Sequence, residues 1–398
     1  MMLGTAAYAY FAAMAAGGLD LLPAVLAGAY GDERAERFLS FAPTLEEALI
    51  PFLIVLSLQW LFQVNSDGTG YLAQRTMACR DARHARIAAV VFTFAQIVVR
   101  SLLWLVIGFS LLIVYPFDAT LPLTDELVGE RELTFARGMD DLLPPGVRGL
   151  MLTGMLAALA STLDTHLNWG ASYWCNDLYK GIWVERIRKR TAGRAVLVFV
   201  ARLSNLIVLA IALAIMGNLG SIQQAWEMSL LFGAGTGAVL VLRWLWERVN
   251  LYSELGSIVV SLLLAPILLL TVEADWLRLA AMAGASSVVV IVTALFLPET
   301  EMERRVQFFR TVRPLGWWRR TALAAGADPR APLVGLLRAL GALAACAATV
   351  YCWLLGLGMI LLHGDAARGV LLLAAGAIAT VFWWGAVHRH EPAEVATD

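Results

Sequence analysis

Ten stretches of about 20 or more mostly apolar residues follow one another along this chain of 398 residues. An α-helix rises about 1.5 Å per residue, so about 20 residues cross the roughly 30 Å hydrocarbon layer of a bilayer. The sequence therefore predicts an all-α polytopic membrane protein with about ten transmembrane helices. The predicted segments are 2–28, 44–64, 87–115, 146–178, 195–216, 222–246, 252–272, 277–297, 333–361 and 366–388.

Composition excludes several classes of protein. Apolar residues make up 60% of the chain and charged residues only 15%, against about 25% charged in soluble domains. The net charge of -1 offers no basic field for nucleic acid. The four cysteines lack the spacing of a zinc site, and a chain whose lysines are Lys180 and Lys189 alone holds no Walker A motif. No catalytic motif is present, so we expect neither an enzyme nor an organic cofactor.

The basic residues indicate an orientation in the bilayer, because lysine and arginine accumulate in cytoplasmic loops. One set of alternate loops carries 21 of them and the other carries 7, which places both termini in the cytoplasm, most simply in the cell (inner) membrane. The loop 116–145 is then external. The internal loop 298–332 has aromatic pairs among its arginines, which fits either an amphipathic segment lying on an anionic leaflet or a solvated basic loop.

Polar residues concentrate on one face of the predicted helix 146–178. At about 100° per residue, Ser161, Thr165, Asn168 and Ser172 fall within about 60° of one another, and Asp164 lies beside them. An aspartate at the centre of a membrane helix costs about 3 kcal/mol, so such a stripe usually marks a functional site. The alternative is that the hydroxyls bond to their own helix and that Asp164 and Asn168 join helices. Oxygen ligands of this kind suit a small hard cation.

Several segments carry a resemblance to a known family. They read LAALASTLD at 156–164, NWGASY at 168–173, NDLYK at 176–180, GTGYLAQR at 68–75, RWLWERVNLYSE at 243–254 and FFRTVRPLGWW at 308–318. They occur along the chain in the order of the sodium:solute symporter family and resemble that family's segments. The resemblance implies a partial leucine-transporter-like fold of inverted repeats, with residues 1–246 matching core helices 5 to 10 and residues 247–398 forming peripheral helices.

The resemblance also implies sodium ligands. The family's principal site takes two carbonyls from core helix 1 and three ligands that match the Ala158 carbonyl and the Ser161 and Thr162 hydroxyls. A second sodium site in some members uses positions matching Ser161, Asp164 and Thr165. We therefore expect Na⁺ as the coupling ion. One departure is RSLLW at 100–104 in place of a proline-containing segment, which predicts a straighter core helix 7.

The segment 44–64 is the expected place of solute contact. It opens with two glutamates and runs through glutamines into a glycine-containing stretch, so we expect it to break within the membrane and expose backbone groups there. The candidate contacts are Gln59, Trp60, Gln63, Asn65 and Arg100. Trp60 is equally well explained as an interfacial or core aromatic, and Arg100 as the partner of Asp164 in a structural ion pair.

Core helices 1 to 4 of the family have no counterpart here, which leaves three explanations open. The chain is the C-terminal portion of a longer symporter, or another chain supplies the first repeat, or transport has been lost. The expected function is therefore a sodium-coupled symporter, or a portion of one, that moves a small organic solute across the lipid bilayer by alternating access. The alternative is a non-transporting membrane subunit or sensor derived from a symporter.

Overall fold

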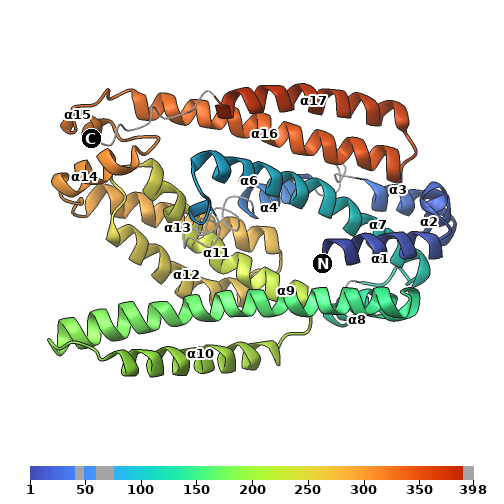
Figure 1. Ribbon diagram of the computed structural model, residues 1–398, viewed down its shortest axis with the longest axis horizontal. Helices are drawn as coiled ribbons and strands as arrows, with labels where there is room; N and C mark the ends of the chain where they lie inside the picture. The colour runs from blue at the N-terminus through green and yellow to red at the C-terminus, as the bar shows by residue number, and fades with distance from the viewer. Residues whose placement is uncertain (41–48, 60–75, 123, 389–398) are drawn as a thin grey trace. The chain divides into compact units, whose positions relative to one another are not determined.

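The computed structural model describes residues 1–40, 49–59, 76–122 and 124–388 (Figure 1). Within these ranges the structure is helical and forms no strand apart from one isolated bridge between Trp246 and Trp317. Among the described residues, eight helices are long and apolar enough to cross a membrane, or nine if a bent pair near the N-terminus counts as one span. The expectation of an all-α polytopic membrane protein is confirmed. Of the predicted segment 44–64, only residues 49–59 are described.

The described helices have the following bounds. They are α1 Met2–Ala15, η1 Leu19–Leu21, α2 Leu22–Tyr30, α3 Asp32–Leu39, α4 Leu49–Gln59, α6 Ala82–Phe94, the π-helical turn η3 Ala95–Val99, α7 Arg100–Val114, α8 Asp125–Leu142, α9 Pro145–Ser172, the π-helical η4 Tyr173–Ile187, α10 Arg194–Met216, α11 Ile222–Leu245, α12 Leu251–Thr271, α13 Asp275–Phe296, α14 Met302–Val312, α15 Arg319–Ala324, α16 Ala331–Leu362 and α17 Ala366–His388. They group into two compact units, one of residues 1–22 and 103–225 and the other of residues 23–102 and 226–398.

The N-terminal apolar segment is not one unbroken helix. Helix α1 ends at Ala15, and a new helical stretch begins at Leu19. Gly17 and Gly18 separate them with φ values of 100° and 98°, a conformation that glycine adopts without the steric penalty of a side chain. The prediction of a continuous helix over 2–28 is therefore wrong, because two consecutive glycines interrupt the helical hydrogen bonding.

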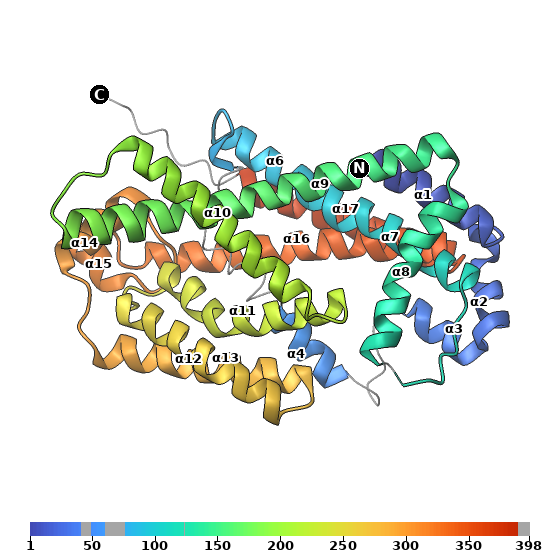
Figure 2. The same ribbon diagram turned by 90° about the horizontal axis from the view of Figure 1, so that it is seen from below.

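In the first unit, α1 packs on α8 and α9. Tyr8 is fully buried, donates a hydrogen bond of 2.8 Å to the Phe135 carbonyl and meets the Phe135 ring edge-on. Glu132, also on α8, accepts hydrogen bonds from the backbone amides of Ile222 and Gln223 at 2.9 and 3.0 Å and so caps the N-terminus of α11. Helix α10 lies against the C-terminal part of α9 in Figure 1 and crosses it in Figure 2.

In the second unit, small residues allow helices to approach closely. Helices α11, α12 and α13 share a core that is formed by the buried residues Leu231, Ala234, Ala238, Ala265, Leu268, Leu279, Met282 and Ala283. Helices α16 and α17 form a hairpin in which Gly356 and Gly369 face each other's helix, where an added Cβ would lie about 3 Å or less from neighbouring atoms. Val350 of α16 packs against Val98 and Leu102.

Candidate functional site

The polar stripe lies on α9, a helix of 28 residues that begins with Pro145 in its first turn, where a missing amide hydrogen costs nothing. No proline interrupts the helix up to Ser172. Ser161, Thr162, Asp164 and Asn168 are exposed within the first unit, and Thr165 is partly buried. The helix therefore presents the predicted cation ligands along one open face, as the 3.6-residue period requires.

The hydroxyls on this face bond to their own helix. Thr162 Oγ1 donates to the Ala158 carbonyl at 2.9 Å, and Thr165 Oγ1 donates to the Ser161 carbonyl at 2.9 Å. This is the back-bonding that the sequence left open as an alternative. It also sets two proposed sodium ligands, the Ala158 carbonyl oxygen and the Thr162 hydroxyl oxygen, 2.9 Å apart on adjacent turns.

The charged and amide groups of the stripe pair with each other. Asn168 Nδ2 donates to Asp164 Oδ1 at 2.8 Å, one turn away on the same helix. His166 Nδ1 lies 2.9 Å from the Thr162 carbonyl. No group of three or more His, Cys, Asp or Glu side chains that could hold a metal ion occurs in the part of the chain that the structure describes. The chemistry of the stripe is thus that of neutral oxygens with one nearby carboxylate, which suits a monovalent cation better than a tightly held transition metal.

The predicted solute contacts are placed only in part. Trp60, Gln63 and Asn65, and the side chain of Gln59, lie outside the described residues. Arg100 is exposed at the start of α7, directly after the π-helical turn η3. The helix continues from Arg83 to Val114 through that turn. Whether these residues contact a solute, and whether Arg100 pairs with Asp164, both stay predictions.

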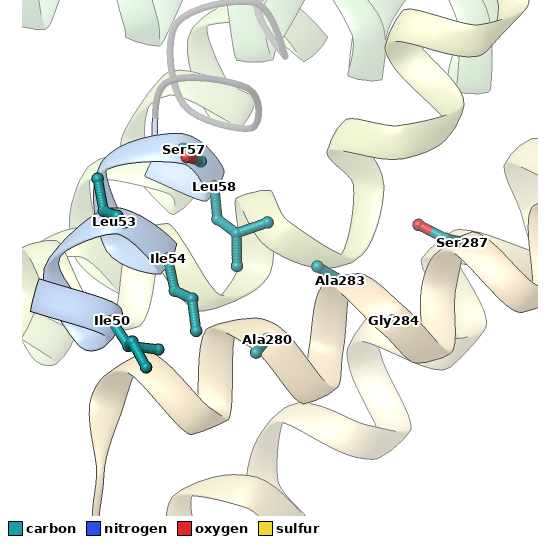
Figure 3. A pocket seen from close by; sticks show the side chains of 9 residues that line it. All are labelled: Ile50, Leu53, Ile54, Ser57, Leu58, Ala280, Ala283, Gly284 and Ser287. Carbon is teal, nitrogen blue, oxygen red and sulfur yellow. The ribbon is translucent and has the colours of Figure 1, made fainter.

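An apolar groove of about 590 Å³ lies between α4 and α13 in the second unit. Figure 3 shows Ile54 and Leu58 of α4 directed toward Ala280 and Ala283 of α13. The groove's polar side chains are the hydroxyls of Ser57 and Ser287. With two isolated hydroxyls and no charge, this groove offers no set of ligands for an ion.

Two of the recognised motifs, residues 243–254 and 308–318, meet in space in the second unit. Trp318 Nε1 donates to the Trp244 carbonyl at 2.9 Å, and the Trp317 amide donates to the Leu245 carbonyl at 2.6 Å. Gly316 has a φ of 104° and lies so close to the Leu245 carbonyl that a side chain would collide with it. The sequence did not indicate this pairing.

The aromatic residues of loop 298–332 are divided between the protein interior and the surface. Phe309 and Trp318 are 7% and 5% exposed and pack with Ala322, whereas Trp317 is 52% exposed. The two buried rings are therefore held by the protein itself. Trp317 is left as the ring available to a leaflet or to solvent, so neither interpretation of this loop is decided.

Sequence reasoning also missed a polar pocket in the first unit, where α10 meets α9 and η4. Arg194, Arg202, Asn168, Asn176 and Asn205 line it. One signal was present in the sequence, because Arg202 stands inside an otherwise apolar helix and intramembrane arginines are rare. Asn168 and Asn176, which join it in the pocket, come from α9 and η4 and could not be read from α10 alone.

Comparisons with known proteins show which family this chain is similar to. The model of the sodium:solute symporter family matches residues 1–263. The chain is 32% identical over 125 residues to the high-affinity proline transporter PutP of Bacillus subtilis, covering 30% of this chain and 25% of that protein. It is 32% identical over 127 residues to the sodium/proline symporter of Escherichia coli, covering 31% and 24% of the two chains.

A mammalian relative matches a longer stretch. The chain is 25% identical over 188 residues to sodium/glucose cotransporter 1 of Oryctolagus cuniculus, covering 45% of this chain and 28% of the relative. The matches thus span about a quarter of the length of these curated relatives, which are transporters rather than enzymes. Because the family model matches well over half of its residues, this integral membrane chain belongs to the sodium:solute symporter family.

Proposed function

We propose that the natural protein carrying this chain is a sodium-coupled symporter that moves a small organic solute across the membrane by alternating access. The observation that carries the proposal is the pair of oxygens on α9. The Ala158 carbonyl and the Thr162 hydroxyl lie 2.9 Å apart, and Ser161 stands beside them in the same family motif. When the hydroxyl hydrogen turns away, both oxygens can contact one Na⁺.

The remaining ligands of this principal site belong to segments outside α9. Three oxygens on one helix leave part of the coordination shell of a sodium ion unfilled, so the ion links α9 to the segments that complete the shell. Sodium binding would then favour the arrangement in which those segments lie against α9, and this differential affinity is what couples an ion to a conformational change. Asp164 and Thr165 with Ser161 form the proposed second sodium site.

The solute is proposed only by class. The names of the relatives specify proline and glucose, which are small, polar and uncharged overall. Gln59, Trp60, Gln63, Asn65 and Arg100 remain the proposed solute contacts. The division into core residues 1–246 and peripheral residues 247–398 is likewise a proposal. The alternative function is a non-transporting membrane subunit or sensor, and the following experiment distinguishes it from a symporter.

The test is uptake of labelled proline and labelled glucose into vesicles that contain the complete natural protein, driven by a sodium or a potassium gradient. We expect sodium-dependent uptake of one solute. Ser161→Ala and Thr162→Ala should each raise the sodium concentration for half-maximal uptake roughly tenfold, as expected for losing a ligand worth about 1.4 kcal/mol. Thr153→Ala, an exposed hydroxyl elsewhere on α9, is the matched control.

Three results would contradict the proposal. Equal uptake with a sodium gradient and with a potassium gradient would show that transport is not coupled to sodium. An unchanged sodium dependence in both Ser161→Ala and Thr162→Ala would show that these hydroxyls are not sodium ligands, even if the protein transports solute. The absence of any solute uptake together with intact membrane insertion would favour the non-transporting subunit.

A further inference from the structure

The polar pocket between α10 and the continuous helix of α9 and η4 is a second group of polar side chains in the first unit. Its volume is about 420 Å³. Arg194 and Arg202 line it from α10, and Asn168 and Asn176 line it from the facing helices. It contains none of the proposed sodium ligands, and no aspartate or glutamate lines it. The lining therefore carries two positive charges and no negative charge.

The arginines are not neutralised by the protein that surrounds them. None of the ion pairs between described residues includes Arg194 or Arg202. The two residues are eight positions apart on one helix, or about 12 Å along its axis, and both reach the same pocket. Arg194 begins α10, whereas Arg202 lies inside it, where a guanidinium in the membrane is costly unless it meets a polar or anionic partner.

The amide groups of the pocket have hydrogen-bonding capacity to spare. Asn176 Nδ2 donates one hydrogen bond, to Ser172 Oγ at 3.2 Å, although an amide nitrogen carries two hydrogens. The buried Oδ1 of Asn205 has no hydrogen-bond partner among the described residues. The pocket thus combines charged donors, neutral donors and one acceptor that lacks a donor, which fits an anion that also bears a hydroxyl group.

The outer faces of the same helices are apolar and exposed. Val198 lines the pocket and is 44% exposed, and Phe199 beside it is 65% exposed. Trp183 on η4 is also exposed, and the Arg188 guanidinium lies 5.1 Å from the centre of its ring. Aromatic rings next to arginines mark the interface between hydrocarbon and headgroups. An anion bound in this pocket would therefore lie at the level of the lipid headgroups, where the acyl chains of a lipid begin.

We propose that this pocket binds the phosphate headgroup of an anionic membrane phospholipid. The phosphate oxygens lie between the Arg194 and Arg202 guanidinium groups, which donate charge-assisted hydrogen bonds. A headgroup hydroxyl, such as that of phosphatidylglycerol, donates to Asn205 Oδ1. The acyl chains run along Val198 and Phe199. Basic pockets between transmembrane helices are a recurring place for acidic headgroups.

The test measures lipid binding to the full chain, purified in a neutral detergent, by native mass spectrometry and by titration with short-chain lipids. We expect phosphatidylglycerol to bind at least about tenfold more tightly than phosphatidylcholine, which has the same phosphate but no net charge. Arg202→Gln should weaken the binding of phosphatidylglycerol about tenfold. Arg137→Gln, an exposed arginine on α8 that does not line the pocket, should leave binding unchanged.

Further variants and ligands keep the result interpretable. Phosphatidylglycerol should bind more tightly than a lipid with a hydroxyl-free anionic headgroup, such as phosphatidic acid methyl ester. Asn205→Leu should reduce this difference in affinity. Inorganic phosphate at millimolar concentration should not displace the lipid, and sodium should not alter its affinity. Equal binding of phosphatidylglycerol and phosphatidylcholine, equal effects of Arg202→Gln and Arg137→Gln, or displacement by inorganic phosphate would each overturn the proposal. None of these readouts depends on solute transport.

Discussion

The carboxylate of Glu247 accepts hydrogen bonds from both the backbone amide and the hydroxyl of Thr321, at 2.8 and 2.7 Å, although 74 residues separate the two. Glu247 is 7% exposed and also accepts from the Arg320 amide at 3.2 Å. These amides belong to the first turn of α15, where a negative charge is favoured. A residue that follows α11 thereby caps a helix of the loop 298–332.

Removing this cap should destabilise the second unit. Glu247→Ala leaves the buried Thr321 amide and hydroxyl without a partner, and we expect a loss of about 3 kcal/mol in the free energy of unfolding. Thermal unfolding of the purified protein, followed by tryptophan fluorescence, measures the change. Glu303→Ala removes an exposed glutamate on α14 and should change stability by no more than about 0.5 kcal/mol. Equal melting temperatures for the two variants would contradict a stabilising role for the cap.

A cluster around Glu299 predicts a dependence of stability on pH. Its carboxylate lies 3.1 Å from Arg248 Nε, 3.0 Å from Arg320 Nη1 and 2.9 Å from Arg305 Nη2. Burial favours the neutral acid, but the hydrogen bonds from Arg248 and Arg320 and the charge of Arg305 outweigh it. They hold the pKa of Glu299 below its ordinary value of 4.5.

A carboxyl group whose pKa is lowered by folding stabilises the folded state above its unfolded pKa. That stabilisation disappears as the pH falls through the lower pKa of the folded state. We therefore expect the melting temperature to fall as the pH drops below about 4.5, and to fall less steeply in Glu299→Gln. Glu301→Gln, which removes the partner of Arg304 in an exposed ion pair, should keep the steep fall of the unmodified protein. Parallel curves for the unmodified protein and Glu299→Gln would show that the cluster is not the source.

Close packing between α1 and α8 depends on Gly138. A Cβ at this position would lie 2.6 Å from Leu111 Cδ2 and would collide with the Tyr8 hydroxyl. Gly138→Ala should therefore destabilise the first unit by about 1–3 kcal/mol, the usual cost of overpacking. Gly149→Ala is the matched control, because no atom lies within 4 Å of an added Cβ there. If both alanine variants melt at the same temperature, the packing inferred for Tyr8 is wrong.

The charge distribution predicts which loops reach the cytoplasm. With the four native cysteines replaced, a single cysteine in Glu126→Cys should react with a membrane-impermeant maleimide on intact cells, because loop 116–145 is expected outside. A single cysteine in Glu303→Cys should react only after the cells are permeabilised. Both native glutamates are exposed, so access to reagent depends on the side of the membrane. Labelling in the reverse pattern would invert the proposed orientation of the whole chain.

The sequence by itself determined the features that depend on short-range periodicity. The length and apolar character of the segments predicted membrane helices, and the 3.6-residue period placed Ser161, Thr165 and Asn168 on one face of α9. The bonds that the structure adds there, such as that of Thr162 to Ala158, join residues four positions apart. Such contacts follow from helix geometry, so a correct helix assignment already contains them.

Only the tertiary structure decided which distant residues meet. Nothing in the local pattern around Glu247 points to Thr321, and Arg202 is a lone charge until α10 lies against the asparagines of α9 and η4. The two glycines that break the first apolar segment were visible in the sequence, but glycine is also common within membrane helices. Long-range pairs depend on how whole helices pack, and many residues contribute to that packing at once, so no single motif encodes them.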